Sequence, residues 1–226
     1  MMKSVTLLAA FSYVLLWPSG VIGQSKPMTM EEMHRLHQDP NAYVAMLDDP
    51  ARDAYQKPHD VVMALGLTEG ERVADIGSGS GYFTLRFASH VGKTGVVYAV
   101  DVSPDMIVHL NRRIRDTGVD NVRTILAPPD DPLLPDHSVH LFFICETWHH
   151  IENRSKYLAL MRRMLDPGGQ VVVVDFQAKP TPVGPPPEMR VRRDDVVNEF
   201  RAAGYRLVRE PTFLPYQYFL AFELGA

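Results

Sequence analysis

Cysteine is nearly absent from the sequence, since Cys145 is the single thiol among 226 residues. An intrachain disulfide is therefore excluded, as is a zinc site built from several cysteines. The chain also lacks a large charge of one sign, because 23 basic and 27 acidic residues leave a net charge of −4. This balance argues against bulk attraction to nucleic acid or anionic lipid. Hydrophobic residues at 46% and charged residues at 22% are typical of a globular domain.

The first 23 residues differ in composition from the rest of the chain. Lys3 precedes an apolar run over residues 5–17, and a proline and small residues follow. This order is typical of a secretory signal peptide, and the run is short for a membrane span of about 20 residues. We expect residues 1–23 to be a signal peptide, with export to the periplasm or the extracellular space. The alternatives are an N-terminal anchor, which would be the chain's one membrane contact, and a cytoplasmic protein that starts later.

After residue 58, apolar strands alternate with amphipathic helices. Strands are expected over 72–76, 96–101, 122–126, 139–145, 171–176, 205–209 and 216–223. Helices are expected over 59–66, 82–90, 104–116, 154–166 and 193–203. This alternation predicts an α/β fold, doubly wound, with a mostly parallel seven-stranded sheet and helices on both faces. The connection between the last two strands is too short for a parallel crossover, which predicts an antiparallel strand at the C-terminal edge.

The strongest motif is V-A-D-I-G-S-G-S-G-Y at residues 73–82, between a strand and a helix. Its candidate ligand-binding residues are Asp75, Gly77, Ser78, Gly79 and Gly81. Glycines allow positive φ and close approach of a ligand, and the next helix presents free N–H groups. The spacing differs from the G-x-G-x-x-G of nicotinamide enzymes. A carboxylate before the first glycine would repel a diphosphate but suits an ammonium group.

A second acid, Asp101, ends the strand over 96–101. A carboxylate at this place can accept hydrogen bonds from both hydroxyls of a ribose. S-adenosylmethionine carries both an amino acid and a nucleoside, so it satisfies the two acids together. Simpler roles stay open, because Asp75 could cap the following turn and Asp101 could cap the helix at 104. Ser103 is better placed for that second role.

The ordered motifs resemble the class I S-adenosylmethionine-dependent methyltransferases, particularly the branch with ubiquinone/menaquinone-type and arsenite-type enzymes. The likeness covers residues 55–224 and includes V-Y-A-V-D-V-S-P-D-M-I at 97–107, L-L-P-D-H-S-V at 133–139, L-D-P-G-G at 165–169 and F-R-A-A-G-Y at 200–205. It implies a Rossmann-like methyltransferase domain over 59–226. It also implies that residues 24–58, which read as short helices joined by turns, form a lid over the cofactor.

The resemblance assigns roles to several residues. Asp75 and the glycine bend would hold the methionine moiety and Asp101 the ribose. Val102 and Met106 would sandwich the adenine, although Met106 could equally be core. In the family, an acidic residue contacts the adenine amine, and the matching position in this chain is Pro128. Either Asp130 takes the place of that acid, or the amine is bound by backbone groups alone.

Three further residues are expected near the cofactor. Tyr55 and Gln56 belong to the lid segment, and Glu146 follows the strand over 139–145. Gln56 could equally be a surface residue.

Residues 146–150, E-T-W-H-H, are expected at the carboxyl edge of the sheet, where ligands of open α/β folds lie. An oxygen or nitrogen acceptor must lose a proton, and histidine titrates near neutral pH. His149 and His150 are therefore candidate catalytic bases, although both could pack or bond locally. Trp148 could wall an apolar acceptor or fill a gap. The proline-rich loop at 180–187 is expected either to shape the acceptor pocket or to act as a tether.

These observations favour methyl transfer from S-adenosylmethionine to a small-molecule acceptor, without a metal. A single cysteine disfavours arsenite, whereas an apolar or quinone-like acceptor fits better. The alternative from another class is an exported module that binds S-adenosylmethionine or S-adenosylhomocysteine without transfer. The sequence indicates no oligomeric state.

Overall fold

A computed structural model describes residues 28–225 of the chain. The expected signal peptide, at residues 1–23, lies outside the described residues. Across residues 28–225, no helix combines the length and the apolar character that crossing a membrane would need.

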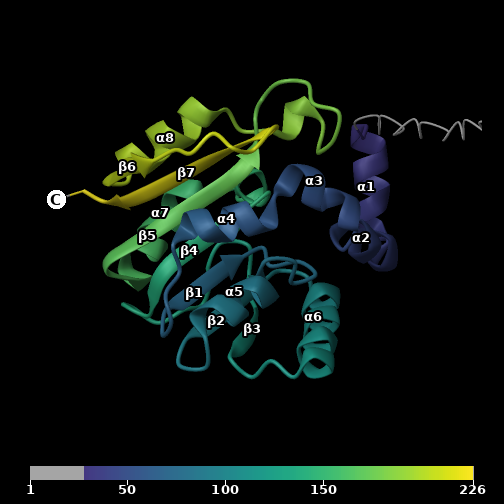
Figure 1. Ribbon diagram of the computed structural model, residues 1–226. Helices are drawn as coiled ribbons and strands as arrows, with labels where there is room; N and C mark the ends of the chain where they lie inside the picture. Colours follow the sequence, from purple (N-terminus) through teal and green to yellow (C-terminus); the bar gives the residue numbers. More distant parts are fainter. Residues whose placement is uncertain (1–27, 226) are drawn as a thin grey trace, which may run out of the picture.

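A single mixed sheet organises the chain (Figure 1). Its strands are β1 (Arg72–Ile76), β2 (Val96–Asp101), β3 (Val122–Leu126), β4 (Val139–Cys145), β5 (Leu165–Phe176), β6 (Tyr205–Arg209) and β7 (Gln217–Leu224). They lie in the order β3-β2-β1-β4-β5-β7-β6. Strands β1 to β5 are parallel, and β7 runs antiparallel between β5 and β6. The predicted fold class is confirmed, and the antiparallel C-terminal strand is β7, one place in from the edge.

The central strand β4 shows why this sheet is buried on both sides. Phe142 and Ile144 pack in one apolar cluster, whereas Leu141 and Phe143 pack in the other. Side chains alternate between the faces of a strand, so an almost wholly apolar strand needs helices on both faces. The helices α7 (Arg154–Met164) and α8 (Arg193–Ala202) contribute to the first cluster. The second includes residues of α4 (Pro58–Leu65), α5 (Thr84–Val91) and α6 (Pro104–Thr117).

The N-terminal segment, residues 28–58, adds short helices on the side of the carboxyl strand ends (Figure 1). They are α1 (Met30–Gln38), α2 (Pro40–Leu47), the 3-10 turn η1 (Pro50–Arg52) and α3 (Asp53–Gln56). Two further 3-10 turns, η2 (Trp148–His150) and η3 (Pro187–Met189), lie in the loops after β4 and β5.

The largest difference between a predicted boundary and the structure lies at the start of β5. The helix expected over 154–166 ends at Met164, and β5 begins at Leu165 instead of residue 171. Leu165 already pairs with Val139, and the pairing shifts register before it resumes at Gln170. This irregularity conceals the early start of the strand, because Pro167 and the glycines after it read as a turn.

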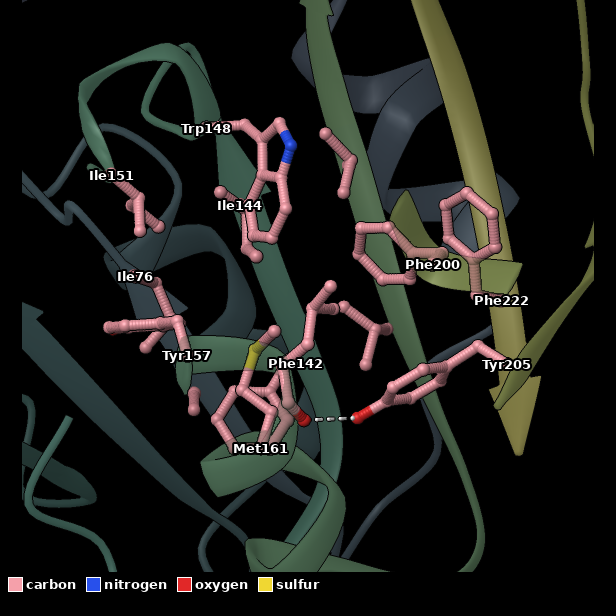
Figure 2. Packing of buried hydrophobic residues seen from close by; sticks show 14 of the residues in the cluster. Ile76, Phe142, Ile144, Trp148, Ile151, Tyr157, Met161, Phe200, Tyr205 and Phe222 are labelled. Carbon is pink, nitrogen blue, oxygen red and sulfur yellow. Dashed lines mark hydrogen bonds between the residues drawn. The ribbon is translucent and has the colours of Figure 1, made fainter. Parts of the chain in front are cut away.

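Trp148 belongs to the first apolar cluster, together with Phe142, Met161 and Phe200 (Figure 2). Its side chain is fully buried, its ring is 5.1 Å from that of Phe200, and its Nε1 donates to Glu199 Oε2 at 2.9 Å. Trp148 is not among the residues that line the cavity, so the structure favours the second of its two predicted roles, the filling of a gap in the core. Sequence alone could not distinguish these roles, because both demand a large apolar ring.

Candidate functional site

A cavity of about 1340 Å³ lies at the carboxyl ends of the parallel strands. Its walls are the glycine bend after β1, the loops after β2, β4 and β5, and the N-terminal segment. The order of the strands reverses between β1 and β4, and open α/β sheets bind ligands at this switch point.

The glycine bend has a left-handed backbone, which favours glycine. Gly77 and Gly79 adopt φ of +70° and +52°, and both line the cavity. A Cβ at Gly77 would lie 2.2 Å from Thr147 Oγ1, and one at Gly81 would lie 2.3 Å from Leu110 Cδ1. Gly77 thus lets the loop after β4 approach, whereas Gly81 lets α6 pack against the bend.

The two acids predicted from the sequence are both buried and line the same cavity. Asp75 accepts a hydrogen bond from Thr84 Oγ1 at 2.6 Å, and burial raises the pKa of Asp75 to about 7. Asp101 accepts from the N–H groups of Gly79 at 2.7 Å and Ser103 at 2.9 Å. Burial also raises the pKa of Asp101, against the lowering effect of these bonds. Ser103 itself caps α6, as expected.

Two hydroxyl groups in the glycine bend lack partners. The Oγ atoms of Ser78 and Ser80 are buried and have no hydrogen-bond partner within residues 28–225. Buried polar atoms are normally satisfied, so unpaired ones that face a cavity indicate a polar ligand. Both serines line the cavity.

The N-terminal segment is joined to the core by polar side chains, which meet Cys145, Glu146 and Gln217. Gln56 is fully buried and donates to Cys145 Sγ at 2.9 Å. Gln217 Nε2 lies 2.8 Å from Gln56 Oε1 and 2.7 Å from Glu146 Oε1. Arg52 Nη2 lies 3.5 Å from Glu146 Oε2. Burial raises the pKa of Glu146 and Arg52 opposes that shift.

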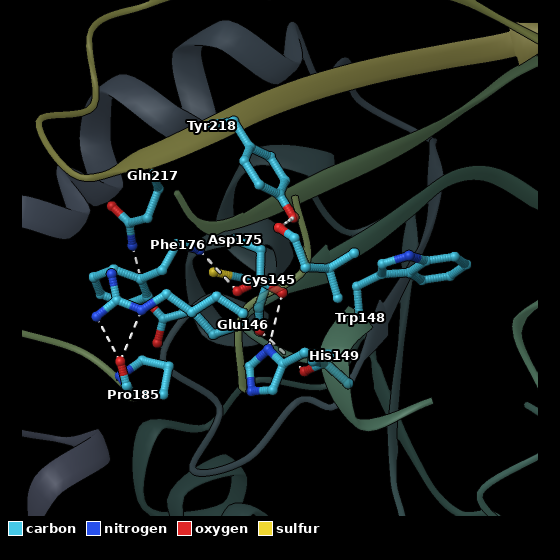
Figure 3. A network of polar contacts seen from close by, with 12 residues as sticks. Cys145, Glu146, Trp148, His149, Asp175, Phe176, Pro185, Gln217 and Tyr218 are labelled. Atoms are coloured by element: carbon cyan, nitrogen blue, oxygen red, sulfur yellow. Dashed lines mark hydrogen bonds and ion pairs between the residues drawn. The ribbon is translucent and has the colours of Figure 1, made fainter. Parts of the chain in front are cut away.

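His149 forms a buried pair with Asp175, which Figure 3 shows at the ends of β4 and β5. His149 Nδ1 and Asp175 Oδ2 are 2.9 Å apart, and the two side chains are 4% and 0% exposed. Burial alone would lower the pKa of His149, but the bond to Asp175 and its charge raise it more, so the net shift is upward. His149 lines the cavity, as does His150, whose ring lies 4.1 Å away.

The remaining predicted residues divide into those at the cavity and those away from it. Val102, Met106 and Tyr55 line it. Met106 is also buried in the fold, whereas Val102 is exposed. Asp130 lies outside the cavity lining and pairs with Lys156 at 2.5 Å. These placements do not test contact with a cofactor, so each role stays a prediction.

Apolar side chains line much of the cavity. They come from the N-terminal segment, from the loops after β4 and β5 and from the loop before β7. They include Met28, Met33, Met46, Ile151, Pro182, Val183, Met189 and Pro215. The proline-rich loop at 180–187 therefore shapes this wall, as one of the two sequence hypotheses stated.

Sequence reasoning missed three residues at or beside the cavity. Asp175 lies near the end of the apolar strand β5, and the same position in a strand singled out Asp75 and Asp101. Arg52 and Gln217 carried no such signal, because their partners lie far away along the chain.

The chain is similar in sequence to known methyltransferases. A family model described as "Methyltransferase domain" matches residues 73–169. A ubiquinone/menaquinone biosynthesis C-methyltransferase from Psychromonas ingrahamii is 33% identical over 112 residues, which are 49% of this chain and 45% of that protein. The enzyme of the same name from Ectopseudomonas mendocina is 33% identical over 52% of this chain and 46% of its own length. The chain thus spans about half the length of the curated relatives it matches.

Solved structures extend the likeness beyond that segment. A SAM-dependent methyltransferase from Aquifex aeolicus is 29% identical, covers 81% of this chain and 97% of its own, and superposes with a TM-score of 0.77. An arsenic(III) S-adenosylmethionine methyltransferase from Chlamydomonas reinhardtii shares the fold at 20% identity, with a TM-score of 0.54 over 70% of this chain and 64% of its own.

Proposed function

We propose that this chain, which belongs to the class I S-adenosylmethionine-dependent methyltransferases, transfers a methyl group to a small apolar acceptor. The observation that carries the proposal is one cavity in which a glycine bend with two buried acids is continuous with an apolar wall. Its volume of about 1340 Å³ exceeds the roughly 300–1,000 Å³ of a typical single-ligand pocket. A donor and an acceptor can therefore be held together.

The residues around the glycine bend fit S-adenosylmethionine. The hydroxyls of Ser78 and Ser80 have no hydrogen-bond partner within the described residues, and Gly77, Gly79 and Gly81 adopt the positive φ of a tight bend. Asp101 would hold the ribose, and Asp75 would face the amino acid end. When bound, S-adenosylmethionine supplies an electrophilic methyl group on a sulfonium.

The apolar wall favours an acceptor with a flat, apolar body. Quinone-related rings have this character, and the curated relatives are named for ubiquinone and menaquinone biosynthesis. The chain's own contribution would be to align the acceptor with the donor, exclude water and accept a proton. We assign the last role to His149 and His150, and their position in the cavity lining supports this assignment.

Two measurements on the full chain test this function. Calorimetry should detect binding of S-adenosylhomocysteine but not of NAD. Asp101→Asn should weaken the binding of S-adenosylhomocysteine at least tenfold. The control is Asp105→Asn, because Asp105 is an exposed acid in the first turn of α6. Normal affinity in Asp101→Asn would remove the ribose assignment.

Methyl transfer from labelled S-adenosylmethionine is then measured over hydroquinones, 1-naphthol, 1-naphthylamine and quinoline. Binding without transfer to any of them would favour the alternative, a module that holds the cofactor or its demethylated product. Transfer to a hydroquinone would support the quinone-like acceptor.

The location of the protein is a separate proposal, which rests on the composition of residues 1–23. We propose that they direct export and that residues 24–58 act as a lid. Fractionation of cells that express a C-terminally tagged chain tests the export, and a soluble cytoplasmic chain with intact Met1 would contradict it.

A further inference from the structure

The buried pair of His149 and Asp175 has a defined direction. A carboxylate accepts hydrogen bonds and cannot donate them, so the proton between the two side chains belongs to His149 Nδ1. The other oxygen of Asp175 accepts from the N–H of Phe176 at 2.8 Å, which fixes the carboxylate. A neutral His149 must then carry its lone pair on Nε2.

That second nitrogen is free. Within the described chain, His149 Nε2 has no hydrogen-bond partner, and His149 lines the cavity. We infer that Asp175 is a positioning residue that holds His149 with the lone pair of Nε2 available to the acceptor. The inference rests on the proposed methyl transfer, and it names the acceptor class: a molecule that carries an O–H or N–H proton at the atom to be methylated.

The step balances with this assignment. The acceptor's O–H or N–H bond breaks, its proton goes to His149 Nε2, and its electron pair forms the new bond to the methyl carbon. The electrons of the broken carbon–sulfur bond stay on sulfur, which leaves a neutral thioether. The imidazolium of His149 is stabilised by Asp175, which remains ionised.

A second histidine–aspartate pair in the same sheet provides a contrast. His140 and Asp166 lie at the opposite, amino ends of β4 and β5, with His140 Nε2 at 3.1 Å from Asp166 Oδ2. There His140 Nδ1 accepts from the N–H of Arg72 at 2.9 Å, so both ring nitrogens are occupied. The pair at the cavity differs because it leaves one nitrogen unused.

The charged groups around His149 come from several elements. Asp175 and Glu146 raise its pKa, and Arg154 of α7 lowers it, in addition to burial. Burial lowers the pKa of His150 on η2 and of His37 on α1, and the charge of His149 lowers both further. Among these, Asp175 makes the direct bond, so its removal should shift the titration of His149 most.

The test is NMR titration of labelled histidine in the full chain with S-adenosylhomocysteine. We expect neutral His149 in the Nδ1–H form and a pKa lower by about one unit or more in Asp175→Asn. Asp166→Asn is the matched control and should leave the titration of His149 unchanged. An Nε2–H form, or an unchanged pKa in a folded Asp175→Asn variant, would overturn the inference.

Kinetics then separate this inference from the proposed function. Only neutral His149 accepts a proton, so kcat/KM for 1-naphthol should rise with pH through the pKa of His149. Asp175→Asn should move this rise to lower pH and reduce the maximum. Quinoline is methylated without losing a proton, so its kcat/KM should not follow this rise with pH. Transfer to quinoline but not to 1-naphthol would refute the acceptor class. If neither reacts, the proposed function fails, while the NMR result still decides the role of Asp175.

Discussion

Replacing Arg190 should open the wall of the cavity without unfolding the domain. Arg190 is buried, and its guanidinium donates five hydrogen bonds to the carbonyls of Gln177, Lys179, Val183 and Pro185. Prolines lack N–H groups, so a proline-rich loop cannot be held by hydrogen bonds between its own backbone groups alone. A single side chain therefore supplies most of the donors that fix this loop.

The size of the effect follows from these bonds. At a net value of about 0.5–1.5 kcal/mol each, the loss of five bonds in Arg190→Ala should favour loop opening by about 2.5–7.5 kcal/mol. Each 1.4 kcal/mol is a tenfold change, so the open population should rise by at least about fiftyfold. The melting temperature should fall only modestly, because the sheet and its two apolar clusters are unchanged.

Hydrogen exchange of the peptide over residues 177–191 measures the opening directly. In the same variant, the KM of the acceptor should rise at least tenfold. The affinity for S-adenosylhomocysteine should stay within twofold, because the side-chain hydrogen bonds of Arg190 all go to residues 177–185 and none goes to the glycine bend. Arg192→Ala is the control, since this neighbouring side chain is exposed and does not cap α8. Unchanged exchange in Arg190→Ala would refute the reasoning.

Two further substitutions test the glycine bend and the acid before it. Gly77→Ala places a Cβ against Thr147, so affinity for S-adenosylhomocysteine should fall at least tenfold; Gly66→Ala shares the positive φ but meets no atom within 4 Å and should keep its affinity. Equal losses in both variants would point to backbone strain alone. Burial raises the pKa of Asp75 from 3.8 to about 7, so its contribution to stability is full below about pH 4 and is lost as the pH rises through 7. In urea unfolding, Asp75→Asn should therefore lose less stability than the wild type between pH 4 and 7, and identical pH profiles would contradict the assignment.

The sheet could be predicted from the sequence because each of its first four strands is marked by a local sequence pattern. The runs at 72–76, 96–101, 122–126 and 139–145 are short, apolar and bounded by turns, and each matches the observed strand at both ends. The first acid of the site was found in the same way, since Asp75 stands where an apolar strand meets glycines.

Contacts across long stretches of chain could not be predicted. Gln56 and Gln217 are 161 residues apart, and neither belongs to a motif. The burial of Gln56 follows from the N-terminal segment folding onto the end of β7, which periodicity does not reveal. Asp130 shows that a suitable sequence position does not determine a contact. It lies two residues from the position where the family has an acid for the adenine amine, but in the structure it pairs with Lys156 at the surface.

The loop after β4 joins the two halves of the cavity. Glu146 adopts φ of +53°, which is uncommon for a residue other than glycine, and turns the chain sharply at the end of the strand. Thr147 then lies against Gly77 of the glycine bend, while His149 reaches Asp175 at the end of β5. The ion pair with Arg52 and the bond from Gln217 stabilise this turn. One short segment therefore contacts both the glycine bend and the pair of His149 and Asp175, and under the proposed function a displacement of Glu146 would misalign donor and acceptor together.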